Sequence, residues 1–278
     1  IIKFIGNSYS SPQLAFFRNF FALIPIIFLL IITRDIKNIF VGISKKFLFL
    51  CFLRGISFVL MQIFYYISII NMNFATATTL TFSSPIFIVV LSMLVLKEKI
   101  GLFRWSAIFI GFGGVLLIMN PTSELFSYIS ILPLLAALCW AISNIVLKFI
   151  PEDISSVKIN FYSINFSYIG SLIILLFSSD FSPVENSFDW LLLILIGILG
   201  GIASILFSFA YRVVSPSTLA PFEYLGIPSS FILGWIFFYE APIEQLFPGV
   251  LGIVAAGFII IWREKKLSIG KIVSNKIH

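Results

Sequence analysis

The sequence predicts an all-α, polytopic membrane protein with ten helices arranged as two inverted halves of five. Three observations predict it: an apolar composition, apolar runs long enough to cross a bilayer, and basic residues confined to alternate connections. The chain of 278 residues is 60% hydrophobic and only 11% charged, and its mean hydropathy is +1.10. A soluble domain carries about 25% charged residues, so much of this surface requires lipid as its solvent.

The spans follow from the apolar runs between charged or Pro-, Gly- and Asn-rich breaks. A helix needs about 20 mainly apolar residues to cross a bilayer core about 30 Å thick. The runs at 24–32 and 191–207 have no polar face, which is typical of spanning helices. Open sheets are excluded because lipid cannot satisfy the amides at their edges. We expect a stub at 1–6 and full spans at 12–33, 47–70, 74–96, 103–119, 128–149, 158–178, 189–211, 217–239 and 246–262.

The distribution of charge predicts the topology. Short cytoplasmic loops of membrane proteins collect Lys and Arg. Most basic residues lie in every second connection and in the tail from Arg263, whereas the alternate connections contain no Lys or Arg. We therefore expect a multi-pass protein of a bacterial-type cytoplasmic (inner) membrane, with its C-terminus in the cytoplasm. The pI of about 9.3 reflects this orientation, and nucleic-acid binding is not expected.

The two halves of the chain resemble each other. A gapless shift that places Pro85 on Pro228 also places Gly114 on Gly257. Four spans and the stub precede the middle of the chain, and five spans follow it, so the second half enters the membrane with the opposite orientation. We expect ten helices in the intact protein, with most of helix 1 absent from this chain. The expected units are a first repeat at 1–120 (truncated helix 1 and helices 2–5), a second repeat at 128–262 (helices 6–10) and a basic cytoplasmic tail at 263–278.

Four charged residues lie away from the ends of the expected stub and spans: Lys3, Arg18, Arg54 and Glu223. A charge at a helix centre costs about 2.5–3.5 kcal/mol on insertion scales, so these side chains are expected to point inward and to bind the solute. For the basic residues the alternative is that they snorkel to the interface, above all Arg54. For Glu223 the alternative is a structural partner of an arginine.

Two prolines, Pro85 and Pro228, fall near the midpoints of matching spans. A proline there removes a backbone hydrogen bond and bends the helix. Broken helices at corresponding positions of two halves indicate a transport site at the bilayer midplane, and the alternative is a kink that serves packing. Further candidates for substrate binding are polar or aromatic residues within the spans, each of which can also serve as a helix–helix hydrogen bond: Asn19, Tyr65, Trp140, Asn144, Tyr211 and Tyr224.

No cofactor, metal site or disulfide is expected. Cys51 and Cys139 lie in apolar stretches, where free cysteine behaves as a small hydrophobe. The single histidine is His278, and the spans contain no Asp pair and no HExxH sequence. An intramembrane enzyme is therefore not the expected function.

Several sequences, in order and spacing, resemble EamA-type members of the drug/metabolite transporter superfamily. In the first half these are FFRNFFAL around Arg18, LRG at 53–55, NFATATTLTFSSPIF and KEKIGLFRWSAIFIGFGGVLLIMNP. In the second half the resemblance runs through LAPFEYLGIPSSFILGWIFFYEAPIEQLFPGVLGIVAAGFIIIWREKK. The resemblance implies a ten-helix inverted-repeat transporter with a central cavity. Solutes in such families include amino acids, nucleotide-like metabolites, vitamins and other organic ions.

The function predicted from these observations is secondary transport of a small organic metabolite by alternating access. Arg18 and Arg54 would attract a carboxylate or phosphate, and Glu223 would bind an ammonium group or exchange a coupling proton. An amino acid or an S-adenosylmethionine-like zwitterion would use both signs. The alternative is a lipid flippase or scramblase, which requires a groove open to lipid. The sequence leaves both a monomer and a homodimer open.

Overall fold

The computed structural model describes residues 5, 8–71, 74–119, 128–178, 181–229 and 247–277. Within these ranges the chain forms helices and no strand. Six of the described helical segments are long and apolar enough to cross a membrane, and two shorter apolar helices, Leu102–Ile118 and Gly249–Arg263, accompany them. The all-helical class predicted from the sequence is confirmed.

The helices begin and end close to the predicted spans, except that α13 continues well beyond the predicted end at 262. In chain order they are α2 (Ser11–Ile32), α3 (Lys45–Asn71), α4 (Phe74–Thr81), α5 (Ser84–Val95), α6 (Leu102–Met119), α7 (Ile131–Ile145), α8 (Ser156–Ser178), α9 (Ser187–Val213), α10 (Pro216–Leu219) and α13 (Gly249–Ile277). Four 3-10 segments accompany them: η1 (Asp35–Asn38), η3 (Tyr128–Ser130), η4 (Val146–Phe149) and η5 (Ala220–Leu225). Of the expected stub only Ile5 is described, and Lys3 lies outside the described residues, as does the range 230–246. The ten-helix inverted repeat therefore stays a prediction.

Local sequence explains where the helices start. The Ser10 hydroxyl accepts a hydrogen bond from the backbone N–H of Gln13 at the start of α2, where the first N–H groups lack partners within the helix. At the start of α9 the Asn186 side chain does the same for the N–H of Phe188. Asp189 in the first turn of α9 and Arg212 in the last match the partial charges at the two ends of a helix.

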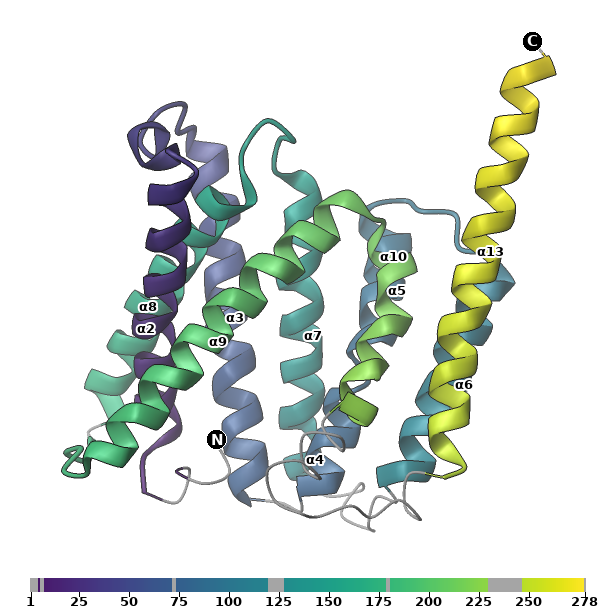
Figure 1. Cartoon of the computed structure of the whole chain (residues 1–278). Helices are drawn as coiled ribbons and strands as arrows, with labels where there is room; N and C mark the ends of the chain where they lie inside the picture. The colour runs from purple at the N-terminus through teal and green to yellow at the C-terminus, as the bar shows by residue number, and fades with distance from the viewer. Residues whose placement is uncertain are drawn as a thin grey trace.

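The helices run back and forth between two faces of the bundle. Figure 1 shows that the connections after α2, α5, η4 and α9 lie at the same end as the C-terminus. These connections carry basic residues such as Arg34, Lys97 and Lys99, so we name this end the basic face. The other end of the bundle is the opposite face.

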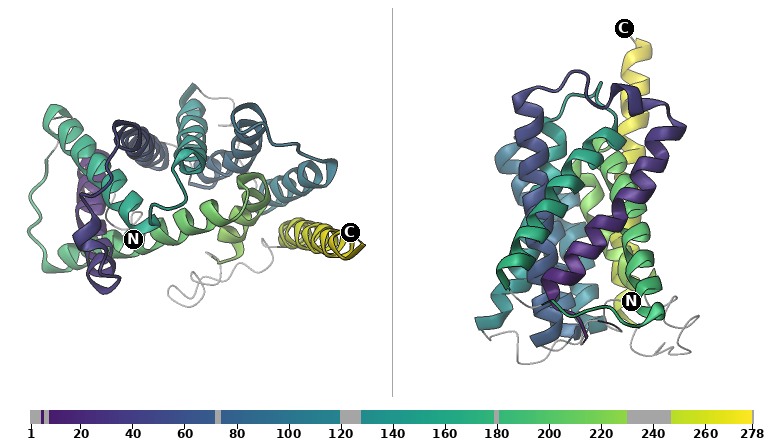
Figure 2. Two further views of the ribbon diagram at one scale, coloured as in Figure 1. Left: turned by 90° about the horizontal axis from the view of Figure 1, so that it is seen from above. Right: turned by 90° about the vertical axis from the view of Figure 1, so that its left-hand side faces the viewer.

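Close packing between α2 and α9 fixes one end of the bundle. α9 crosses obliquely over α2 (Figure 1). Seen from above, α3, α7, α5 and α6 lie along one side of the bundle, and α9, α10 and α13 lie along the other (Figure 2). A Cβ at Gly197 would lie 2.2 Å from the Cβ of Phe21, and one at Gly201 would lie 2.6 Å from the Ala22 carbonyl oxygen. Small residues therefore allow the two backbones to approach, as is common between membrane helices.

The span predicted at 74–96 is broken. α4 ends at Thr81, and α5 begins at Ser84 with Pro85 in its first turn. Proline favours this position because the missing N–H has no partner there in any helix. The segment that contains Glu223 is also irregular: a four-residue α10 continues as the 3-10 segment η5. Pro228 lies in the helical stretch after η5, and residues 230–246, which follow this stretch, lie outside the described residues.

Candidate functional site

Glu223 lies at the meeting point of four helical segments. It projects from η5 and accepts three hydrogen bonds, from Trp140 Nε1 (2.8 Å, α7) and the Tyr211 hydroxyl (2.6 Å, α9) on Oε1 and from the Ser84 hydroxyl (3.0 Å, α5) on Oε2. All three partners are neutral donors. The carboxylate is thus stabilised by three hydrogen bonds from neutral groups. No cation in the described part of the chain forms an ion pair with it.

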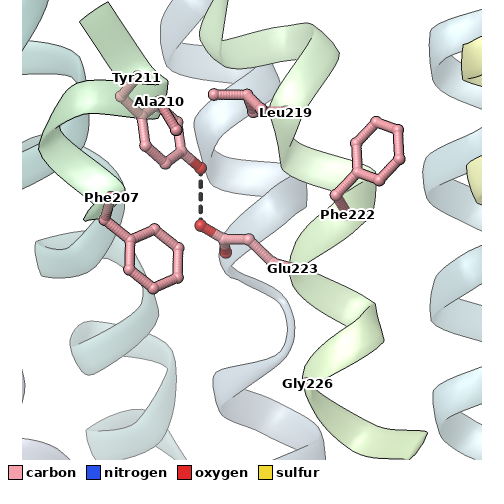
Figure 3. A pocket seen from close by; sticks show the side chains of 7 residues that line it. All are labelled: Phe207, Ala210, Tyr211, Leu219, Phe222, Glu223 and Gly226. Carbon is pink, nitrogen blue, oxygen red and sulfur yellow. Dashed lines mark hydrogen bonds between the residues drawn. The ribbon is translucent and has the colours of Figure 1, made fainter. Parts of the chain in front are cut away.

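Two cavities share Glu223 and the Phe207 ring. The larger, about 310 Å³, is named here the central chamber. Its lining residues are Met61, Tyr65, Thr78, Thr81, Phe82, Ser84, Trp140, Phe207 and Glu223. The smaller, about 190 Å³, is named the side cavity and is drawn in Figure 3. Its lining residues are Phe207, Ala210, Tyr211, Leu219, Phe222, Glu223 and Gly226. Any group that enters either cavity therefore meets the same carboxylate.

Aromatic rings form much of the chamber wall. Tyr65, Phe82, Trp140 and Phe207 all line it. The rings of Trp140 and Phe207 meet edge to face with their centres 5.3 Å apart, an arrangement favoured by the charge distribution of aromatic rings. Such a wall suits a planar ring or an organic cation, because cations are attracted to aromatic faces.

Arg18 is connected to Glu223 by a series of contacts through the rings of Phe58 and Trp140. Its guanidinium carbon is 4.6 Å from the centre of the Phe58 ring, and the Phe58 ring centre is 6.1 Å from that of Trp140. The guanidinium donates to Asn19 Oδ1 (3.1 Å) and to the Gly200 carbonyl oxygen (3.3 Å). A Cβ at Gly200 would lie 2.8 Å from Arg18 Nε. The absence of a side chain at Gly200 therefore leaves space for the Arg18 guanidinium against α9.

Arg54 is buried between α3, α8 and α9. Only 4% of the residue is exposed, so it does not reach the interface by snorkelling. It donates to Asn160 Oδ1 (3.3 Å) and to the Ser208 hydroxyl (2.7 Å), while its Nε has no partner. Asn160 also accepts hydrogen bonds from the hydroxyls of Ser204 and Ser208. A positive charge is therefore held by neutral dipoles alone.

Arg54 is buried and Arg18 and Glu223 are half-buried. None of the three has an ion-pair partner in the described part of the chain, where Glu98 and Arg104 form an ion pair at 3.9 Å. Glu223 is thus not the structural partner of a described arginine. A charge that is held in an apolar bundle without an ion-pair partner is costly. The positive charge of Arg18 contacts the Phe58 ring, and the carboxylate of Glu223 contacts the neighbouring Trp140.

The structure brings some of the predicted site residues together and separates others. Trp140, Tyr211 and Tyr65 join Glu223 at the cavities, and Asn19 joins Arg18. Asn144 instead donates to the Trp140 carbonyl oxygen of its own helix. Tyr224 is fully buried and packs against α6, where a Cβ at Gly111 would lie 2.4 Å from its ring.

Sequence reasoning missed Ser84 and Phe207. Ser84 was recognisable in principle, because it stands at the break before Pro85, where side chains are free to face a cavity. Phe207 carries no signal of its own in a chain with 33 phenylalanines. Its role depends on the tertiary contact of its ring with Trp140.

Comparisons with known proteins agree with this architecture. A solved protein structure superposes on the chain with a TM-score of 0.76 at 15% identity, covering 94% of this chain and 91% of that one, which shows a shared fold. The chain is 29% identical over 272 residues to the S-adenosylmethionine uptake transporter of Rickettsia bellii (strain RML369-C), with 97% of this chain and 90% of the relative covered. It is 32% identical over 188 residues to the riboflavin transporter of Vibrio cholerae, with 67% of this chain and 62% of the relative covered. It is also 25% identical over 268 residues to the pseudopaline exporter CntI of Pseudomonas aeruginosa, with 96% and 91% covered.

The family comparison is more extensive. The model of the EamA-like transporter family matches the chain twice, at residues 1–120 and 127–262. We refer to these ranges as the first and second matched segments. Together with the apolar spanning helices, the matches establish that this chain belongs to the EamA-like transporter family and is a multi-pass membrane transporter of a small metabolite.

Proposed function

We propose that the chain moves a zwitterionic metabolite, an amino acid or an S-adenosylmethionine-like solute, across the cytoplasmic membrane by alternating access. One observation carries the proposal. Arg18 and Glu223 are opposite charges without ion-pair partners in the described part of the chain, and each contacts one of two neighbouring rings, Phe58 and Trp140 respectively.

Each end of such a solute has a complementary charge. A carboxylate would pair with Arg18, and Arg54 adds a second positive charge to that side. An ammonium or sulfonium group would pair with Glu223. At about 4 Å and an effective dielectric constant of about 20, two unit charges attract by roughly 4 kcal/mol. A solute that carries both signs gains this attraction twice, whereas a neutral solute gains it at neither end.

The aromatic wall supports a solute that also contains a planar ring. Tyr65, Phe82 and Phe207 present apolar ring surface to a chamber of about 310 Å³, which lies within the range of small-molecule sites. Two of the relatives transport S-adenosylmethionine and riboflavin, which both contain nitrogen heterocycles. An S-adenosylmethionine-like solute therefore fits the lining better than an aliphatic amino acid.

The proposed mechanism rests on two inverted five-helix repeats that rock about the central chamber. The C-terminus, which lies on the basic face, would be cytoplasmic, because basic connections remain on that side. Glu223 would bind the cationic end of the solute in one step and a coupling proton in another. The proton is proposed here because Glu223 is the one carboxylate in the interior of the expected spans.

Uptake in proteoliposomes tests the proposal. Radiolabelled S-adenosylmethionine should accumulate in a saturable manner, and zwitterionic analogues with a planar ring should compete better than riboflavin or aliphatic amino acids. Melting temperatures across the same panel provide a second measurement, because a ligand that binds only the folded protein raises its melting temperature. Translocation of fluorescent lipid without uptake of any panel member would instead favour the flippase.

A further inference from the structure

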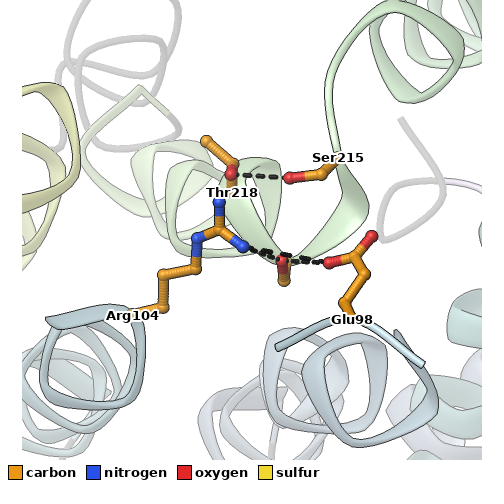
Figure 4. A network of polar contacts seen from close by, with 5 residues as sticks. Glu98, Arg104, Ser215 and Thr218 are labelled. Atoms are coloured by element: carbon orange, nitrogen blue, oxygen red, sulfur yellow. Dashed lines mark hydrogen bonds and ion pairs between the residues drawn. The ribbon is translucent and has the colours of Figure 1, made fainter. Parts of the chain in front are cut away.

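A polar cluster at the basic face joins the two matched segments. Arg104, at the start of α6, donates to the Ser217 hydroxyl at 2.8 Å. The Ser217 hydroxyl in turn donates to Glu98 Oε2 through a very short hydrogen bond, and the Arg104 and Glu98 side chains form the 3.9 Å ion pair. Figure 4 shows this cluster, with the nearby Ser215 and Thr218. Glu98 and Arg104 belong to the first matched segment and Ser217 to the second.

The chain is bent sharply to place Glu98 in this cluster. Lys97 has a positive φ of 56°, a conformation that a residue other than glycine adopts only at a cost. The turn lets the backbone N–H of Glu98 donate to the Ser92 carbonyl oxygen at 3.1 Å. Strain of this kind persists where surrounding contacts hold it, and it is often found at functional sites.

Burial strengthens the cluster beyond an ordinary surface contact. The Arg104 and Glu98 side chains are only 20% and 19% exposed, and Ser217 is fully buried. Exposed ion pairs contribute little because water screens them. Hydrogen bonds to charged groups are stronger when water is excluded, and here one hydroxyl bonds to both charges.

The same short segment connects this cluster to the candidate functional site. Ser217 lies in α10 and Glu223 in η5, which follows α10 without interruption. α5 is held to this segment near both of its ends, through Ser84 and Glu223 at its start and through Glu98 and Ser217 just after its end. A movement of Glu223 relative to α5 therefore acts directly on the cluster.

We propose that Glu98, Arg104 and Ser217 form a gate that closes the basic face between the two matched segments. The gate opens when the α10–η5 segment separates from α5. This inference deepens the proposed function, because alternating access requires one face to be closed while the other is open. When a solute cation or a proton neutralises Glu223, the hydrogen bond from Ser84 loses its charge assistance and weakens, so the attachment of the segment at Ser217 becomes the main barrier.

A thiol reporter placed behind the gate tests it. Leu219 is half-buried, follows Ser217 by two residues and lines the side cavity. In a background with Cys51→Ala and Cys139→Ala, Leu219→Cys is reacted with a membrane-impermeant maleimide in proteoliposomes. Labelling is counted only on molecules whose C-terminal tag faces the reagent, because the C-terminus lies on the basic face (Figure 1). We expect Ser217→Ala to raise the labelling rate about tenfold.

Ser215→Ala is the matched control. The Ser215 hydroxyl bonds to Thr218 within the same segment, at 2.7 Å, so its loss perturbs the start of α10 without touching the contact to Glu98. Its labelling rate should stay within twofold of the parent. Glu98→Gln keeps the shape of the side chain but removes the charge, and we expect a rise of about threefold; it provides the test if Ser217→Ala does not fold.

The outcomes separate the gate from the transport function. Unchanged labelling in both Ser217→Ala and Glu98→Gln, or an equal rise in Ser215→Ala, overturns the gate even if the parent protein takes up S-adenosylmethionine. Faster labelling in the two gate variants supports the gate even if no solute in the panel is transported. In that case the proposed solute is wrong, and the closure of the basic face stands.

Discussion

The hydroxyl of Tyr211 and the carboxylate of Glu223 meet at 2.6 Å across the turn between α9 and α10. The two residues are only 12 positions apart, so the turn between α9 and α10 brings them together. Trp140 and Ser84 then add contacts from helices of distant sequence. The site therefore combines one local contact with two that depend on the assembled fold.

Glu223→Gln is expected to reduce the rate of S-adenosylmethionine uptake at least tenfold and to remove its dependence on pH. The amide preserves the shape of the side chain but offers neither a negative charge nor an exchangeable acidic proton. Uptake measured between pH 5 and pH 8 checks the prediction. Glu185→Gln, at an exposed position outside the helices, is the control and should behave as the parent. An unchanged rate with an unchanged pH profile in Glu223→Gln would remove proton coupling from the proposal.

Tyr211→Phe keeps the ring that lines the side cavity but removes the donor to Glu223. A hydrogen bond to a charged group contributes about 1.5–3 kcal/mol, so we expect a lower melting temperature and an altered KM for the solute. Tyr168→Phe is the matched control, because its ring packs on Phe16 and Phe20 away from the site. Equal melting temperatures for the two variants would show that the bond to Glu223 stabilises nothing.

Arg18→Gln is expected to raise the KM for S-adenosylmethionine about tenfold or more. Loss of a charge-assisted contact to the solute carboxylate costs about 1.5–3 kcal/mol, and about 1.4 kcal/mol corresponds to a factor of ten. Decarboxylated S-adenosylmethionine lacks the group in question, so its inhibition constant should be the same for parent and variant. Arg34→Gln, in an exposed connection, controls for loss of surface charge. An equal loss of affinity for both compounds would show that Arg18 does not bind the carboxylate.

Gly200→Ala is expected to displace the Arg18 guanidinium, because the new methyl group would lie 2.8 Å from Nε. The side chain is flexible, so the protein should fold, and the KM for the solute should rise severalfold. Gly113→Ala offers the control, since a Cβ at that position of α6 would meet nothing within 4 Å. If both variants transport with parental kinetics, the position of Arg18 above α9 is unimportant for binding.

The extent of the helices could be predicted from the sequence because the bilayer imposes a length on every apolar run. The break in the span at 74–96 was also foreseeable, since Pro85 cannot donate a backbone hydrogen bond. The C-terminal helix was underestimated: α13 continues through the basic tail to Ile277, although the apolar run ends near 262. Hydropathy marks the part of a helix that lies in lipid, and it gives no information on a helix that continues into water.

The site was only partly predictable. Glu223 stands out because charge is rare in lipid, and the cost of burial makes an inward position a safe expectation. Trp140 and Tyr211 were among the polar and aromatic candidates, but the sequence did not indicate that their side chains and that of Ser84 converge on one carboxylate, which depends on tertiary packing. Tyr224 shows the converse, since it follows Glu223 in sequence but rotates toward α6. Adjacent residues of a helical segment point in different directions, so proximity in sequence is a poor guide to membership of a site.

The two oxygens of Glu223 serve the central chamber and the side cavity alike. A single anion neutralises a single cation, so we expect positively charged occupants of the two cavities to exclude each other. A cationic compound shaped for the side cavity would then inhibit competitively from a position beside the solute, without resembling the solute in size or outline.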